Sequence, residues 1–117
     1  MDLGSLSSVR AAARKLVEQN VMIDVLINNA GIMAVPYGKT EDGFEMQWGV
    51  NHLGHFLFTA LLLKGGSIGK AGRVVNVTSD GHRLSDVRWK DVGFEVCLLL
   101  RSVQFALHIS WEYRGYG

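Results

Sequence analysis

A chain of 117 residues is long enough for one small domain or for part of a larger one. Apolar residues make up 48% of it and charged residues 20%, which excludes an intrinsically disordered chain. Its net charge is +1, with lysines and arginines scattered, so we expect no nucleic acid among its partners.

Three features favour a cytoplasmic location. The first residues lack the basic-then-apolar pattern of a secretion signal. The longest uncharged apolar run, Phe56–Leu63, is too short to span a bilayer. A single cysteine, Cys97, excludes an internal disulfide and suits a reducing compartment. We therefore expect a cytoplasmic chain without a membrane span.

The first two predicted elements are a helix over residues 5–20 and a strand over residues 22–28. Ser5 is a good N-terminal cap for the helix, whose apolar residues recur at helical spacing. The strand is apolar on both faces apart from Asp24. Strands of this kind are typical of a parallel sheet that is covered on both sides.

The same alternation follows in the second half of the chain. A loop with the only proline, Pro36, leads to a helix predicted from Glu41 to about Lys64, and a glycine-rich break ends this helix. A second strand of the buried kind is predicted over residues 73–79. Helix, strand, helix and strand in this order predict an α/β fold with a doubly wound parallel sheet.

Both predicted strands end in small polar residues. Asn28, Asn29, Ala30 and Gly31 follow one strand, and Ser79 ends the other. Ligands of doubly wound sheets bind beyond these carboxyl ends. Alanine and glycine let a flat ligand approach the backbone, and an asparagine side chain can tie the loop to the neighbouring strand. An ordinary strand-to-helix turn, in which asparagine and glycine are common, is the alternative.

The second predicted helix carries Asn51 in its middle, between Gly49 and Gly54. Each of these residues costs roughly 0.5–1 kcal/mol relative to alanine in a helix. We expect Asn51 either to bond its own backbone and bend the helix or to serve something outside it.

Three ordered segments now carry a resemblance to a known family. "LINNAG", "VNHLGHFLFTALLL" and "GRVVNVTSDGH" resemble the short-chain dehydrogenase/reductase family, and within it the retinol-dehydrogenase-like branch. The resemblance implies that residues 1–94 form a partial NAD(P)-binding Rossmann-like domain, made of the middle strands and helices of the family's sheet. Residues 95–117 are apolar and unlike the family at this place.

The resemblance also implies roles for individual residues. Asn29, Ala30 and Gly31 match the motif that lines the adenosine part of NAD(P), with NAD and NADP undecided. Asp2 matches an acidic residue that contacts the adenine ring, and Val50 matches an apolar residue that packs near the cofactor. No metal is implied.

Two matched residues belong to the family's catalytic set. Asn51 matches the asparagine whose backbone holds a water in the proton relay. Ser79 matches the serine that hydrogen-bonds the substrate carbonyl or hydroxyl; without the family context it would be interpreted as a strand-end cap. Two other parts of the family pattern are absent from the 117 residues. No G-x-x-x-G-x-G turn occurs, and no Y-x-x-x-K can be drawn because no lysine follows Lys90.

Two functions are therefore expected. By resemblance, the intact enzyme moves hydride between NAD(P)H and a carbonyl or alcohol of a small lipophilic substrate, and this shortened form is inactive. The alternative is a non-catalytic remnant or mis-spliced product. It would be unstable, or it would pair with a second copy or a full-length relative through the open edge of the strand over residues 22–28.

Other residues have simpler interpretations. His52 and His55 lie three apart without a carboxylate or cysteine to complete a metal set, which favours structural or surface roles. Trp48 and Phe56 at helical spacing are predicted to lie in the core. Cys97 is predicted to be a buried apolar residue rather than a nucleophile.

Overall fold

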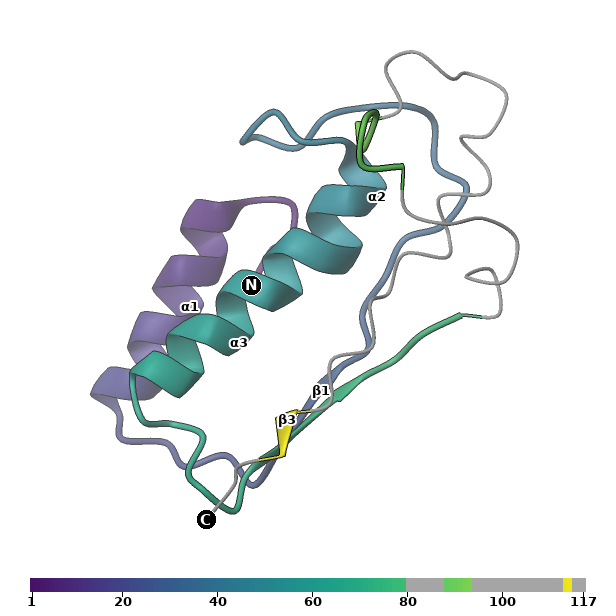
Figure 1. Ribbon diagram of the computed structural model, residues 1–117. Coiled ribbons are helices and arrows are strands. Elements are labelled where there is room, and N and C mark those ends of the chain that lie inside the picture. Colours follow the sequence, from purple (N-terminus) through teal and green to yellow (C-terminus); the bar gives the residue numbers. More distant parts are fainter. Residues whose placement is uncertain (80–87, 94–112, 115–117) are drawn as a thin grey trace.

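The computed structural model describes residues 1–79, 88–93 and 113–114 (Figure 1). Its elements in chain order are α1 (Leu6–Glu18), β1 (Val25–Asn28), α2 (Met46–Trp48), the π-helix η1 (Gly49–Gly54), α3 (His55–Lys64), β2 (Arg73–Asn76) and β3 (Tyr113–Arg114). Cys97 and most of the predicted tail over residues 95–117 lie outside the described residues.

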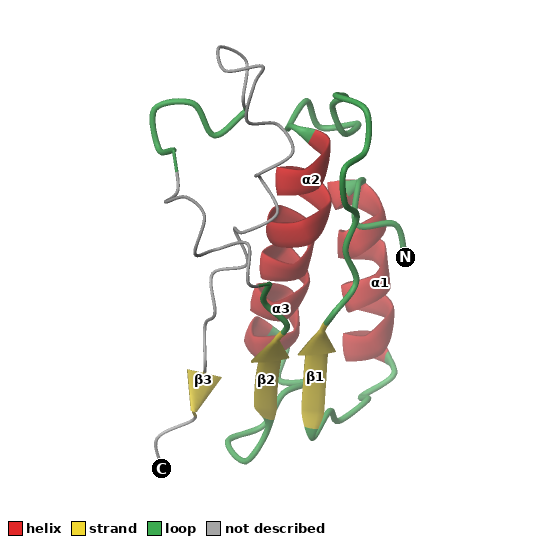
Figure 2. Ribbon diagram, turned by 90° about the vertical axis from the view of Figure 1, so that its right-hand side faces the viewer, coloured by secondary structure: helices red, strands yellow, loops and turns green. Residues whose placement is uncertain are grey.

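The predicted parallel pairing is confirmed. β1 and β2 run parallel, with Val25 opposite Arg73 and Asn28 opposite Asn76. β3 adds a short antiparallel partner to β2, so the described strands have the order β1-β2-β3, with β1 at one edge. Both parallel strands point the same way beneath the helices in Figure 2. The structure is thus a small α/β unit of two parallel strands and helices, as expected.

Helix α1 begins where the sequence predicts it. Ser5 is the N-cap, and its hydroxyl accepts a hydrogen bond from the Ser8 amide at 3.4 Å. The inner side of the helix buries Val9 and Ala13 against α3. Side-by-side packing of α1 and α3 forms the helical layer of the fold (Figure 1).

The second helical segment begins later than predicted. Residues 41–44 form a turn and Glu45 pairs with Lys39 in an isolated β-bridge, so the helix begins at Met46. Gly43 has a φ of +83°, which is incompatible with a right-handed helix. Glu45 then caps the segment, since its carboxylate accepts hydrogen bonds from the amides of Gln47 at 3.0 Å and Trp48 at 2.7 Å.

The core lies between the helical layer and one face of the sheet. Its buried apolar residues are Val9, Ala13, Phe58, Leu62, Ile68 and Val74. Leu62 and Val9 are the largest of the fully buried side chains. None of the helices in the described part combines the length and apolarity needed to cross a bilayer.

The other face of the sheet is open, so the prediction that both faces are covered is wrong for the described residues. Apolar side chains on this face are between 40% and 59% exposed, namely Val25, Ile27, Val75 and Val77. The cause is topological: the right-handed β1–α3–β2 connection places α3 on one side of the sheet, and α1 packs beside α3 on that same side.

The predicted core position of Phe56 is also wrong. Phe56 is 63% exposed, and Trp48 is only partly buried. The inner face of α3 is formed by His55, Phe58 and Leu62 instead. Phe56 follows His55 by about 100° around a helix, which turns it outward. There its ring follows those of Trp48 and His52 along the helix, and the ring centroids of Trp48 and His52 are 4.5 Å apart.

Candidate functional site

The site begins at the carboxyl ends of β1 and β2. Asn28 is only 4% exposed, and its Nδ2 donates to Asn76 Oδ1 at 2.7 Å and to Thr59 Oγ1 at 3.0 Å. One side chain thereby joins the ends of both strands to α3. The hypothesis that an asparagine ties the loop to the neighbouring strand is confirmed.

Asn51 holds the loop that follows β1. Its Oδ1 accepts a hydrogen bond from the Ile32 amide at 2.8 Å, and its Nδ2 donates to the Ile32 carbonyl at 2.9 Å. Gly31 approaches this amide closely, since a Cβ there would lie 3.4 Å from Asn51 Oδ1. Of the two expectations for Asn51, service to a group outside its helix is confirmed.

The glycines around Asn51 have packing reasons. A Cβ on Gly49 would collide with the side chain of Thr40, and a Cβ on Gly54 would lie 2.7 Å from the Leu3 carbonyl oxygen. Both glycines are buried within the π-helix η1, which departs from regular helical geometry. Single π-helical turns inside α-helices are rare in proteins overall. Those that occur often lie at functional sites.

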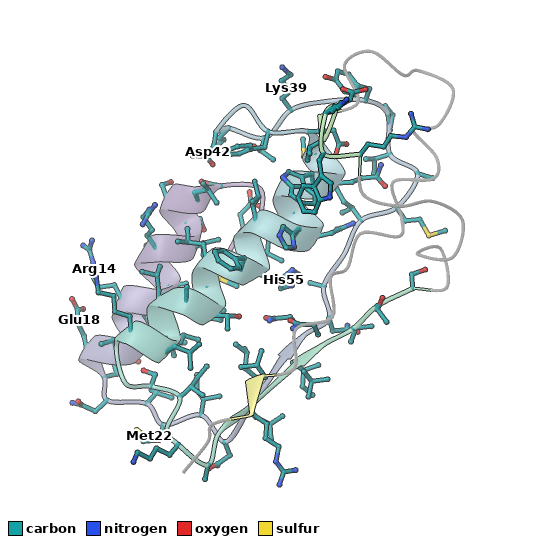
Figure 3. The ribbon with its side chains drawn as sticks, in the orientation of Figure 1. Arg14, Glu18, Met22, Lys39, Asp42 and His55 are labelled. Atoms are coloured by element: carbon teal, nitrogen blue, oxygen red, sulfur yellow. The ribbon has the colours of Figure 1, made fainter. Side chains whose placement is uncertain are left out.

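His55 lies one helical turn after Asn51 and contacts its backbone. Its ring is buried, and Nδ1 is 3.0 Å from the backbone oxygen of Asn51. Figure 3 shows the ring on the side of the helix that faces the strands in that view. Burial lowers the pKa of His55, and hydrogen bonds to the Asn51 and Val50 backbone partly offset this effect. Sequence reasoning gave His55 only a structural or surface role; its spacing of four from Asn51 was the signal available.

Acidification should lower the free energy of unfolding through His55. Because its folded pKa lies below the ordinary value of 6.5, the unfolded chain takes up a proton first as the pH falls. This stability is fully present above pH 6.5 and is lost as the pH falls towards the folded pKa. Urea unfolding between about pH 7.5 and about pH 5.5 measures how steeply the free energy of unfolding changes with pH. This slope should be smaller in His55→Asn, which lacks the titrating ring. An unchanged slope in His55→Asn would contradict the prediction.

The structure places the predicted nucleoside-binding residues as follows. Asn29, Ala30 and Gly31 are exposed and follow the carboxyl end of β1. Asp2 lies in the turn before α1, where its Oδ1 accepts from the Gly4 amide at 2.8 Å. A Cβ on Gly4 would lie 3.3 Å from Asp2 Oδ1 and 3.5 Å from Val50 Cγ2. Asp2 and Val50 therefore flank the same glycine.

Ser79 lies at the same edge of the sheet as the loop after β1. It is half-buried and follows the last residue of β2 by three positions. Asn51 is half-buried too, on the helical segment that packs above the strands. The fold thus places the predicted catalytic residues at the carboxyl edge, where ligands of parallel sheets bind.

The described residues suit the nucleoside half of a dinucleotide better than its phosphates. Small exposed residues after β1 can wall a flat base and ribose. Helix N-termini, which bind phosphates in many sites, already carry carboxylates here. Asp42 Oδ2 accepts from the Leu6 amide at the start of α1 at 2.8 Å (Figure 3), and Glu45 caps α2. A phosphate at either of these helix N-termini would be repelled by the carboxylate, so neither end provides a phosphate site. They also contain no group of three or more metal-ligating side chains.

Comparisons with known proteins show what this chain is similar to. A family model described as short chain dehydrogenase matches residues 1–89. Retinol dehydrogenase 13 of Homo sapiens is 46% identical over 81% of this chain and 29% of its own length. Retinol dehydrogenase 14 of Homo sapiens is 50% identical over 81% of this chain and 28% of its own length.

Two further matches extend the comparison. Retinol dehydrogenase 12 of Homo sapiens is 40% identical over 100% of this chain and 40% of its own length. A crystal structure of an uncharacterized protein from Mycobacterium paratuberculosis superposes with a TM-score of 0.72 and 48% identity, covering 82% of this chain and 33% of the other. The chain therefore spans less than half the length of these proteins.

Proposed function

Because the chain belongs to the short-chain dehydrogenase family, we propose that its described residues form the nucleoside wall and part of the proton-relay framework of an NAD(P)-dependent oxidoreductase. The substrate class is a small lipophilic alcohol or carbonyl compound. This assignment is supported by the similarity to proteins named retinol dehydrogenases. A bound NAD(P) would supply or accept the hydride.

The observation that carries the proposal is the two-point bond between Asn51 and Ile32. Both polar atoms of the Asn51 amide are bonded to the loop backbone, at 2.8 Å and 2.9 Å, so the side chain acts as a clamp on the loop. It fixes Asn29, Ala30 and Gly31 against the helix while its own backbone remains near the edge of the sheet. Ser79 at this edge would hydrogen-bond the substrate oxygen.

We further propose that these 117 residues alone turn over negligibly. Moving the hydride requires a group that moves the accompanying proton at neutral pH. In the family pattern that group is a tyrosine four residues before a lysine, and no lysine follows Lys90 here. The 117 residues also contain no G-x-x-x-G-x-G turn, which holds the cofactor phosphates in the family pattern.

A nucleotide titration followed by NMR tests the proposal. AMP added to the ¹⁵N-labelled chain should shift the amide signals of Ala30, Gly31 and Val50, because these residues would line the base and ribose. Nicotinamide mononucleotide, which has a phosphate and ribose but no adenine, is the matched control and should shift them much less. Equal shifts with both nucleotides, or none with AMP, would contradict the assignment. NADPH oxidation with a carbonyl substrate should show no rate above background.

A second candidate function is non-catalytic pairing. It is favoured by the position of β1 at the sheet edge and by the exposure of Val25 and Ile27. An unpaired edge with an apolar face is a template for another strand. Light scattering on the same samples discriminates: a mass that remains monomeric, alone and mixed with a full-length family member, would exclude pairing.

A further inference from the structure

The backbone carbonyl of Asn51 does not take the hydrogen bond that an α-helix would give it. In an α-helix the amide of residue 55 bonds the carbonyl of residue 51. Here the His55 amide bonds the His52 carbonyl instead. The His55 ring does reach the Asn51 carbonyl, with Nδ1 at 3.0 Å from the oxygen. The side chain of His55 thus stands in for its own backbone amide.

This contact specifies the state of the ring. A carbonyl oxygen can only accept, so Nδ1 must carry the hydrogen. Burial lowers the pKa of His55, which keeps the ring neutral near pH 7. A neutral ring with hydrogen on Nδ1 has no hydrogen on Nε2. The structure therefore requires one particular tautomer of a buried histidine.

Asn51 is consequently held at two places. Its side chain forms hydrogen bonds with the backbone amide and carbonyl of Ile32, and its own backbone carbonyl accepts a hydrogen bond from the His55 ring. The first contact fixes the loop after β1 against the helix. The second fixes the orientation of the Asn51 peptide plane. A carbonyl oxygen accepts two hydrogen bonds, and the ring satisfies one of them.

We propose that His55 is a positioning residue for Asn51: its Nδ1–H replaces the helical amide, keeps the segment Gly49–Gly54 in its π-helical form, and directs the second lone pair of the Asn51 oxygen towards the site. The proposal rests on the proposed function, in which a water or hydroxyl donor would use that lone pair. Without the ring, the amide of residue 55, which bonds carbonyl 51 in a regular α-helix, would compete for this oxygen. Its bond to Asn51 would draw the oxygen back into the helical ladder.

A purely space-filling role predicts a different result, and a pair of variants separates the two. In His55→Asn the amide nitrogen Nδ2 takes the place of Nδ1 along the side chain, so the donor is kept. In His55→Phe a ring of similar size is kept and the donor is lost. Asparagine and phenylalanine have comparable helix propensities, so the backbone cost is matched.

NMR on the ¹⁵N,¹³C-labelled full chain is the test. The wild type should show the ¹⁵N signature of a neutral ring protonated at Nδ1. In His55→Phe the Asn51 carbonyl ¹³C signal should shift, because the backbone amide of residue 55 replaces the ring as its donor, and the Ile32 amide should exchange with solvent roughly fivefold faster, since about 1 kcal/mol of hydrogen-bond stabilisation is lost. His55→Asn should restore both values towards the wild type.

Two results would overturn the proposal. One is a wild-type ring protonated at Nε2. The other is an Asn51 carbonyl signal that responds equally to both variants. If His55→Phe fails to fold, the wild-type tautomer and the His55→Asn carbonyl signal still decide. None of these measurements uses a cofactor, so an intact His55 signature together with a failed AMP titration would refute the proposed function alone.

Discussion

Gly54→Ala should destabilise the chain by about 1–3 kcal/mol, although alanine is the better helix former by roughly 1 kcal/mol. A Cβ at this position would lie 2.7 Å from the Leu3 carbonyl oxygen and 3.0 Å from Leu3 Cδ2. The backbone oxygen cannot rotate away as a flexible side chain would. The segment before α1 would therefore have to move off the π-helix.

Urea unfolding of Gly54→Ala measures this effect. Gly69→Ala is the matched control, because the nearest atom to a Cβ there is Met22 Cε at an ordinary 3.5 Å. We expect the control to change the free energy of unfolding by no more than about 0.5 kcal/mol. A Gly54→Ala protein as stable as the wild type would show that Leu3 can move away without loss.

Asn28→Ala should lower the free energy of unfolding by about 2–4 kcal/mol, more than the same substitution at the exposed neighbour Asn29. The substitution removes the hydrogen bonds that the buried Asn28 donates to the half-buried Asn76 and Thr59. Losing a hydrogen bond at such a position costs about 1–2 kcal/mol. The ends of β1 and β2 and the middle of α3 would lose their shared link.

Asn29→Ala is the control for this prediction. It changes the adjacent asparagine, which is exposed, and should stay within about 0.5 kcal/mol of the wild type in the same urea experiment. A double-mutant cycle between Asn28→Ala and Asn76→Ala should give a coupling energy of about 0.5–3 kcal/mol. Strict additivity would mean that the 2.7 Å contact contributes nothing to folding.

The exposed face of the sheet has a simple meaning within the family. β1 and β2 have the apolar composition of strands that are buried on both faces, yet the described residues cover one face only. The chain spans 28% of one similar protein and 29% of another. In proteins of their length, further elements of the domain would be available to cover Val25, Ile27, Val75 and Val77.

Short stretches of sequence were enough to predict helix α1 and the two parallel strands. Helix α1 follows from Ser5 and an apolar stripe, and the parallel strands follow from short apolar runs separated by helices. Asn51 stood out because asparagine between two glycines is costly in a helix. That cost predicted either a bend or a partner outside the helix, and the structure shows the partner.

Tertiary structure alone decided the partners. The sequence could not show that Asn51 pairs with Ile32, that Asn28 reaches Thr59, or that Gly54 touches Leu3, because these contacts join residues far apart in the chain. It could not place Phe56 either, since the buried face of α3 depends on how the helix is rotated over the sheet. Periodicity specifies that a helix has an inner face; only packing against α1 and the strands selects which residues form it.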